Sequence, residues 1–230
     1  MSEPTPLRPE TGWGVLHLFC KPRPDASAPS LLNAIEDARK DDCQVVTASM
    51  LGHKADICVL ALALDLRRLR RLQTELQSGG LDVVDSYVSL TEVSEYAAGV
   101  PEEIKQARLY PRLPPENMEA ICFYPMSKRR APGAENWYAL DFEDRLELMK
   151  GHGTAGRAFR GRVLQLVTGS TGLDDFEWGV TLFAVHPDDL KDCVYAMRFD
   201  PASTRYGDFG PFYTGMVAEA EDVLIAVGVR

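Results

Sequence analysis

The order of strand and helix patterns constrains the fold of this chain most, because the same order occurs twice. Short apolar or alternating runs indicate strands, and apolar residues at spacings of three and four indicate helices. The first half predicts strand, helix, strand, strand, helix, strand over residues 12–21, 30–40, 44–51, 56–64, 66–77 and 81–93. The second half repeats this order over residues 119–126, 141–159, 162–169, 178–185, 186–199 and 210–217.

This repeated order is the ferredoxin-like pattern, so the sequence predicts an α+β fold made of two ferredoxin-like halves. Two antiparallel sheets of this kind either pack face to face or close into a barrel. The predicted organisation is a loose N-terminal tail, a first half, a proline-rich linker and a second half, over residues 1–11, 12–96, 97–117 and 118–230. Asp65, directly before the apolar stripe of the 66–77 helix, is the expected N-cap of that helix.

Charge and cysteine content narrow the class of protein. A net charge of −9 argues against nucleic acid as a partner, since a nucleic-acid binder carries a basic face. The five cysteines are dispersed without a CxxC pair, which favours reduced, buried thiols in a cytoplasmic protein. We find neither a signal peptide nor an apolar stretch of the ~18 residues that a membrane span requires, and therefore expect a soluble, intracellular protein.

His152 is the most unusual candidate residue, because it lies on a predicted helix between Gly151 and Gly153. Each glycine costs a helix interior roughly 1 kcal/mol relative to alanine. Helical spacing places His152 on the same face as Leu148 and Met149, so packing in the core is one interpretation. The other is that the glycines clear space for a flat group such as a porphyrin, whose iron a single histidine can bind.

The stretch CFYPMSKRR, residues 122–130, carries the second group of candidates. Alternation along a strand places Tyr124 and Met126 on one side, and Lys128 follows just past the expected strand end. Pro125 within the run indicates an edge strand or a bulge. The basic residues that follow form either a solvated turn or a clamp for carboxylates.

Three further candidates occur later in the chain. Gln165 lies in an otherwise apolar strand and is either a buried amide that needs partners or an outward-facing residue. Arg198 and Ser203 lie where Pro201 ends a helix, and they suit either an anionic ligand or structural capping. The acidic residues of the 171–177 turn have the chemistry to bind a hard cation, but their spacing does not match an EF-hand.

Taken together, four stretches resemble the coproheme decarboxylases of the chlorite dismutase superfamily. They are YPMSKRR…NWY, LMKGHGTAGR, QLVTGSTGLDDFEWGVTLF and MRFDPASTRYGDFGPFYTG, in this order. The resemblance is dense from about residue 108 to 215, and over residues 12–95 it rests mainly on the order of the elements. It implies a dimeric α+β barrel of two ferredoxin-like halves, usually assembled as a homopentamer.

The resemblance also implies roles for individual residues. His152 matches the proximal iron ligand, Tyr124 the catalytic tyrosine that forms a radical beside the reacting propionate, and Lys128 the lysine near the second reacting propionate. Met126 lines the pocket, and Gln165 matches the distal glutamine of the bacillus-type members. The residues that hold the propionates correspond to Arg108, Arg198 and Ser203.

The implied reaction is the oxidative decarboxylation of two propionates of iron coproporphyrin III to vinyl groups, which gives haem b and consumes hydrogen peroxide. Coproheme is then both substrate and redox cofactor. The upstream ferrochelatase is the candidate partner that delivers it. The linker and the segment after Gly215 depart from the family pattern, so any propionate contact from the linker beyond Arg108 is open.

Three alternatives remain. True chlorite dismutases carry a distal arginine where this chain has Gln165, which argues against that activity or a dye-type peroxidase on the same fold. A non-catalytic haem carrier or sensor would use His152 but would need neither Tyr124 nor Lys128. A ferredoxin-like interaction domain without iron would place His152 in the core.

Overall fold

The computed structural model describes residues 5–133 and 135–230. Its strands are β1 (Gly14–Pro22), β2 (Gln44–Met50), β3 (Ile57–Ala63), β4 (Leu81–Thr91), β5 (Ala120–Lys128), β6 (Val163–Gly169), β7 (Trp178–Ala184), β8 (Gly207–Phe209) and β9 (Tyr213–Ala218). Its helices are α1 (Ala28–Lys40), α2 (Leu66–Ser78), α3 (Glu102–Leu109), α4 (Phe142–Arg157), α5 (Pro187–Met197), α6 (Pro201–Thr204) and α7 (Ala220–Ala226), with a 3₁₀ turn, η1, at Trp137–Ala139. All twelve predicted elements are present.

The sheet confirms the two ferredoxin-like halves. Strands of the first half lie in the order β4-β1-β3-β2, and those of the second half lie in the equivalent order β6-β7-β5-β9, all antiparallel. The halves join at two seams, where β4 pairs with β6 and β2 pairs with β9. The hydrogen-bonded strands therefore form a closed ring, with β8 added beside the end of β5.

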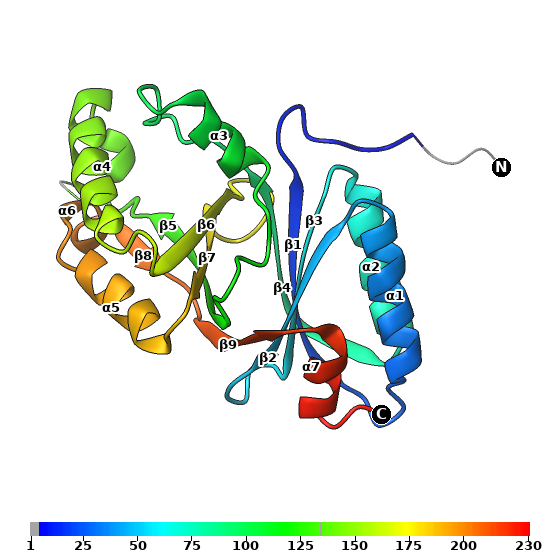
Figure 1. The fold of residues 1–230 in the computed structure, drawn as a ribbon. Coiled ribbons are helices and arrows are strands. Elements are labelled where there is room, and N and C mark those ends of the chain that lie inside the picture. The colour runs from blue at the N-terminus through cyan, green and yellow to red at the C-terminus, as the bar shows by residue number, and fades with distance from the viewer. Residues whose placement is uncertain (1–4, 134) are drawn as a thin grey trace.

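The two sides of the barrel are covered by different helices. Figure 1 shows α1 and α2 on one side of the strands, and α4, α5 and α6 on the opposite side. On the first side, α1 and α2 bury a continuous apolar stripe that includes Leu31, Ile35, Leu69 and Leu72. Asp65 caps α2 as predicted, because its carboxylate accepts a hydrogen bond from the Arg67 amide at 3.0 Å.

Both halves contribute to the core inside the barrel. Val15, Phe19 and Leu60 of the first half pack with Phe123 and Phe183 of the second half. Since neither half alone supplies this core, closure of the barrel and packing of its interior depend on each other. The five cysteines are free and buried, as predicted.

Several short elements were not predicted. Helix α3 lies in the proline-rich linker, and α7 follows the last strand and buries Val223 and Leu224 against the α1 side of the sheet. Residues 1–4 of the predicted tail lie outside the described residues. The next residues are attached to α2, because the Leu7 amide donates to Asp65 at 3.0 Å and the Leu7 carbonyl accepts from the Leu66 amide. None of the helices in the described ranges is long and apolar enough to cross a membrane.

Candidate functional site

Helix α4, which carries His152, differs from α1 and α2 in how it packs. It begins at Asp141, whose carboxylate accepts a hydrogen bond from the Asp144 amide at 2.9 Å. Although α4 spans 16 residues, none of them is buried, and the main packing partners of the helix are α5 and α6 rather than the strands. A helix that buries no apolar stripe leaves its faces accessible to a ligand.

The glycines beside His152 are not required by the packing of the protein. A Cβ at Gly151 would lie no closer than 3.9 Å to a neighbouring atom, and one at Gly153 no closer than 3.5 Å. These are ordinary van der Waals distances, so alanine would fit at both positions and would favour the helix. The two glycines on either side of His152 therefore each leave room for a methyl group that no described atom occupies.

A hydrogen bond to Asp200 fixes the orientation of His152. The imidazole Nδ1 lies 2.8 Å from the Asp200 carboxylate and 3.5 Å from the Ser203 hydroxyl. Because an ionised carboxylate only accepts hydrogen bonds, Nδ1 carries the proton and Nε2 keeps its lone pair. Burial lowers the pKa of His152 despite the opposing effect of Asp200. A neutral histidine with a free Nε2 and a carboxylate behind it is the usual form of a metal-binding histidine.

Asp200 also organises the start of α6. Its carboxylate accepts from the Ser203 amide at 3.1 Å, as an N-cap does, and it is almost completely buried. Ser203 is buried beside it. The segment that follows α5 therefore places the carboxylate and the hydroxyl next to His152, although they lie about fifty residues away in sequence.

Lys128 lies at the end of β5 and close to the same carboxylate. Its Nζ donates to the Ala202 carbonyl at 2.9 Å and lies 4.3 Å from the centre of the Trp137 ring. Burial lowers its pKa to about 8, although Asp200 and Glu177 favour the charged form. Lys128 is thus a buried cation with donors to spare, next to the histidine cluster rather than on a solvated turn.

Tyr124 is buried in the outward face of β5, and its phenol has no hydrogen-bond partner among the described residues. The two tyrosines inside the barrel differ, since Tyr87 bonds to Ser170 and Tyr213 to Asp85. Burial raises the pKa of Tyr124. Met126, two residues along the strand, is partly buried against the same cluster. The ring of Tyr124 is buried while its hydroxyl bonds no described residue, so the hydroxyl can bond a ligand.

The remaining candidates lie at different distances from this cluster. Gln165 is exposed on β6, so the buried-amide interpretation is wrong; its amide donates to the Cys193 thiol at 3.6 Å and lies beside Gly156 of α4. Arg198 caps α5, with its guanidinium 4.2 Å from the centre of the Phe209 ring. Arg108 is exposed on α3, and no described residue forms an ion pair with it or with Arg198.

Sequence analysis missed several residues of the site. Asp200 precedes Pro201 and stands three residues before Ser203, which is a recognisable N-cap pattern and was the available signal. Phe209 and Phe212 contact Tyr124, and Trp137 contacts Lys128. Their contacts are made across strands and between helices, so no local pattern predicted them.

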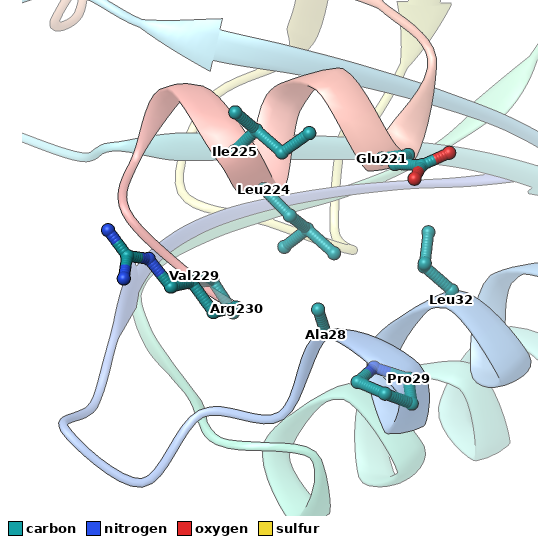
Figure 2. A pocket seen from close by; sticks show the side chains of 8 residues that line it. All are labelled: Ala28, Pro29, Leu32, Glu221, Leu224, Ile225, Val229 and Arg230. Carbon is teal, nitrogen blue, oxygen red and sulfur yellow. The ribbon is translucent and has the colours of Figure 1, made fainter.

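The acidic turn and a surface groove contain none of the candidate site residues. In the acidic turn, Asp174 and Glu177 accept hydrogen bonds from the amides of Val88 and Lys128, and the described residues contain no cluster of three or more metal-ligating side chains. A groove of about 320 Å³ lies between α1 and α7 (Figure 2). It is lined mainly by apolar residues and lies on the side of the barrel opposite α4 and α5 (Figure 1).

The fold and the site define a protein class: a closed α+β barrel of two ferredoxin-like halves, with one carboxylate-bonded histidine on a helix outside the second half. The family profile described as chlorite dismutase matches residues 25–218. The chain belongs to the chlorite dismutase family.

The relatives of this chain include named decarboxylases. Coproheme decarboxylase of Staphylococcus carnosus is 40% identical over 91% of this chain and 93% of that protein. Coproheme decarboxylase of Staphylococcus saprophyticus is 42% identical over 84% of this chain and 81% of that protein. A relative from Natronomonas pharaonis is 38% identical over 97% of this chain, but the chain spans only 42% of that protein's length.

Solved structures show the same fold. A heme-binding protein from Thermus thermophilus has a TM-score of 0.86 and 35% identity, covering 95% of this chain and 96% of that chain. Chlorite dismutase from Candidatus Nitrospira defluvii has a TM-score of 0.75 at 20% identity, with coverage of 95% and 96%. At that identity the second likeness concerns the fold alone.

Proposed function

We propose that this protein is a hydrogen-peroxide-dependent coproheme decarboxylase, which converts two propionates of iron coproporphyrin III to vinyl groups and releases haem b. The observation that carries the proposal is the phenol of Tyr124, which bonds no described residue and lies in the second half together with the buried cation Lys128 and the carboxylate-bonded His152. The two staphylococcal relatives at 40% and 42% identity, both named coproheme decarboxylase, support it.

The described residues fit an iron porphyrin. His152 would hold the iron through Nε2, since Nδ1 is engaged by Asp200. The space that a Cβ would fill at Gly151 and Gly153 would let a flat macrocycle lie close to α4. When bound, the iron porphyrin supplies the redox chemistry, and the protein contributes orientation, exclusion of water and charge.

The cations of the site would hold the propionates. Arg198 and Arg108 are free of carboxylate partners among the described residues, in a chain with 34 acidic and 25 basic residues. Arginine pairs with a carboxylate through two parallel hydrogen bonds, and Ser203 adds a hydroxyl. Lys128 would hold the second reacting propionate, and Met126 would line the pocket.

Tyr124 would take part in the oxidation itself. Each propionic acid group gives up carbon dioxide, two electrons and two protons to become a vinyl group. One hydrogen peroxide takes up those electrons and protons to give two waters. The phenol of Tyr124 would donate a hydrogen bond to the propionate and then lose an electron and a proton. Gln165, in place of the arginine of chlorite dismutases, argues for this reaction over chlorite breakdown.

The proposal also covers the assembly, location, partner and domain organisation of the enzyme. We infer a homopentamer in the cytoplasm that receives its substrate from the upstream ferrochelatase. Residues 12–96 and 118–230 would form the two halves, joined by the segment 97–117, and the porphyrin would bind to the second half.

The test is a titration with iron coproporphyrin III followed by stepwise addition of peroxide and mass analysis of the extracted porphyrin. We expect sequential loss of two carboxyl groups, ending at haem b. Tyr124→Phe should bind the substrate with unchanged affinity but stop decarboxylation, whereas Tyr195→Phe, at an exposed tyrosine of α5, should react like the parent. Tight binding without a mass change would favour a carrier or another peroxidase, and oxygen release from chlorite would then be measured.

A further inference from the structure

The ladder of strand hydrogen bonds is interrupted beside Tyr124. On one edge, β5 pairs with β9 through Ala120–Phe123 and with β8 through Met126–Lys128. Tyr124 and Pro125 lie between these two pairings, opposite the three residues 210–212, so the register of the ladder shifts there. Such interruptions change the direction of nearby side chains and are common beside active sites.

The interrupted segment directs two aromatic rings onto Tyr124. The Phe212 ring stacks on the Tyr124 ring, with centroids 4.5 Å apart and an angle of 24° between the planes. Phe209 contacts the same ring at 5.8 Å and 56°. We call these two phenylalanines the aromatic bracket. Both phenylalanines are partly buried and pack in the same cluster as Tyr124.

The path of the segment is fixed at its first residue. The Gly210 amide donates to the Pro125 carbonyl at 2.9 Å. A Cβ at Gly210 would lie 2.6 Å from Pro125 Cγ and 2.7 Å from Phe176 Cζ, so a larger residue would have to displace these side chains or the segment itself. The spacing of Phe209 and Phe212 around Tyr124 therefore depends on a glycine between them.

Each residue of the bracket also contacts a cation, Phe212 through its backbone carbonyl and Phe209 through its ring. The Lys54 ammonium, in the turn between β2 and β3, donates to the Phe212 carbonyl at 2.7 Å. The Arg198 guanidinium lies over the Phe209 ring. Lys54 belongs to the first half of the barrel, so the first half helps to position a residue of the second-half site.

We propose that Phe209 and Phe212 are positioning residues for Tyr124: they fix its ring, keep water from its sides and leave only the phenol oxygen free for the substrate. This inference rests on the proposed function, in which Tyr124 is the oxidised residue. Because the Tyr124 ring is already fixed before the reaction, it loses little conformational freedom when it reacts. Exclusion of water from its sides also limits loss of the phenol proton to solvent.

The first measurement needs no porphyrin. In protein with carbon-13 at the phenol carbon of tyrosine, the Tyr124 signal is identified by its loss in Tyr124→Phe, and its titration is followed up to about pH 11. The parent signal should not titrate in this range, because burial raises the pKa of Tyr124. Phe212→Leu removes the stacked ring and should bring the titration into range. Phe142→Leu removes a similar stacked ring from Tyr96 and should leave the Tyr124 signal unchanged.

The second measurement uses the protein loaded with iron coproporphyrin III. Phe212→Leu should bind the porphyrin within about threefold of the parent but lose the first carboxyl group at least tenfold more slowly, and its tyrosyl radical spectrum should broaden. Lys54→Met keeps both rings, and it should change the Tyr124 titration and the decarboxylation rate in the same direction but by less. This variant replaces Phe212→Leu as the test if Phe212→Leu does not fold.

The two measurements test the role of the aromatic bracket and the proposed reaction separately. If the parent does not decarboxylate, the proposed function fails, while the titration still decides whether the bracket shields Tyr124. An unchanged Tyr124 titration in both variants would overturn the proposal that the aromatic bracket shields Tyr124. A slower reaction without a shifted titration would also overturn it, because the loss would then arise somewhere other than Tyr124.

Discussion

At the scale of single residues, the candidate site combines polar groups that have defined partners, such as His152 and Lys128, with the Tyr124 hydroxyl, which bonds no described residue. His152 was predicted from its flanking glycines, because glycine inside a helix has a known cost. Asp200, its partner, was not singled out: its N-cap pattern with Ser203 is visible in the sequence, but its contact with His152 across 48 positions leaves no local pattern. Sequence thus predicted residues with unusual neighbours along the chain, and missed those whose role depends on neighbours in space.

The hydrogen bond between Asp200 and His152 gives the first prediction. Asp200→Ala removes the acceptor of Nδ1–H and should lower affinity for iron coproporphyrin III by roughly 10- to 100-fold, as loss of a carboxylate behind a metal-binding histidine does. Asp200→Asn keeps an acceptor and the N-cap but loses the charge, so its effect should be smaller. Titration followed by the porphyrin absorption band measures both. Asp192→Ala, at an exposed site on α5, is the control. Equal affinities in all four proteins would contradict a role for Asp200.

Lys128 gives a prediction of pH dependence. Burial lowers its pKa to about 8, against 10.5 for the free side chain. Between these values the folded protein binds fewer protons than the unfolded chain, so this group makes stability rise with pH from about 8 to 10.5. Binding should follow the opposite course, because the cation that pairs with a propionate is lost above about pH 8. Affinity for the porphyrin should therefore fall through pH 8, and Lys128→Met should bind more weakly without that step. A step that persists in Lys128→Met would assign it to another group.

At the scale of elements, strands and long helices were predictable and short elements were not. The apolar stripe of α2 or the alternation of β1 is a strong local signal. Helix α6 has four residues and β8 has three, which is too short for either period to be recognised. Helix α4 was predicted, but its lack of buried residues was not, because the composition of a helix does not reveal whether the space beneath it is filled.

Helix α4 gives a prediction that separates stability from binding. Gly151→Ala and Gly153→Ala should each stabilise the porphyrin-free protein by up to about 1 kcal/mol, since alanine favours the helix and meets no close contact. The same methyl groups should weaken porphyrin binding, because they occupy space beside His152. Urea unfolding and porphyrin titration measure the two effects. Thr154→Ala, an exposed position on α4, should change stability alone. Stabilised variants with full porphyrin affinity would show that the macrocycle does not approach this face.

At the scale of the whole molecule, the repeated order of elements predicted two ferredoxin-like halves but left face-to-face packing and closure as alternatives. Closure is decided by pairings between residues far apart in sequence. At one seam β2 pairs with β9 through four residue pairs, from Thr47 to Met50, and at the other β4 pairs with β6 through two. No local pattern specifies such registers, because they depend on how both sheets twist.

The closed ring predicts that the halves do not fold alone. Separated chains of residues 1–96 and 118–230 would each expose two unpaired strand edges and one half of the interior core, in which Phe19 stacks on Tyr213 at 3.8 Å. Each piece alone should unfold without a cooperative transition and bind a hydrophobic dye, and mixing the two should restore cooperative unfolding. Urea titrations followed by near-ultraviolet circular dichroism test this. If the second piece alone unfolded cooperatively and bound iron coproporphyrin III, the halves would be independent domains, and the contact from Lys54 to Phe212 would be dispensable for the site.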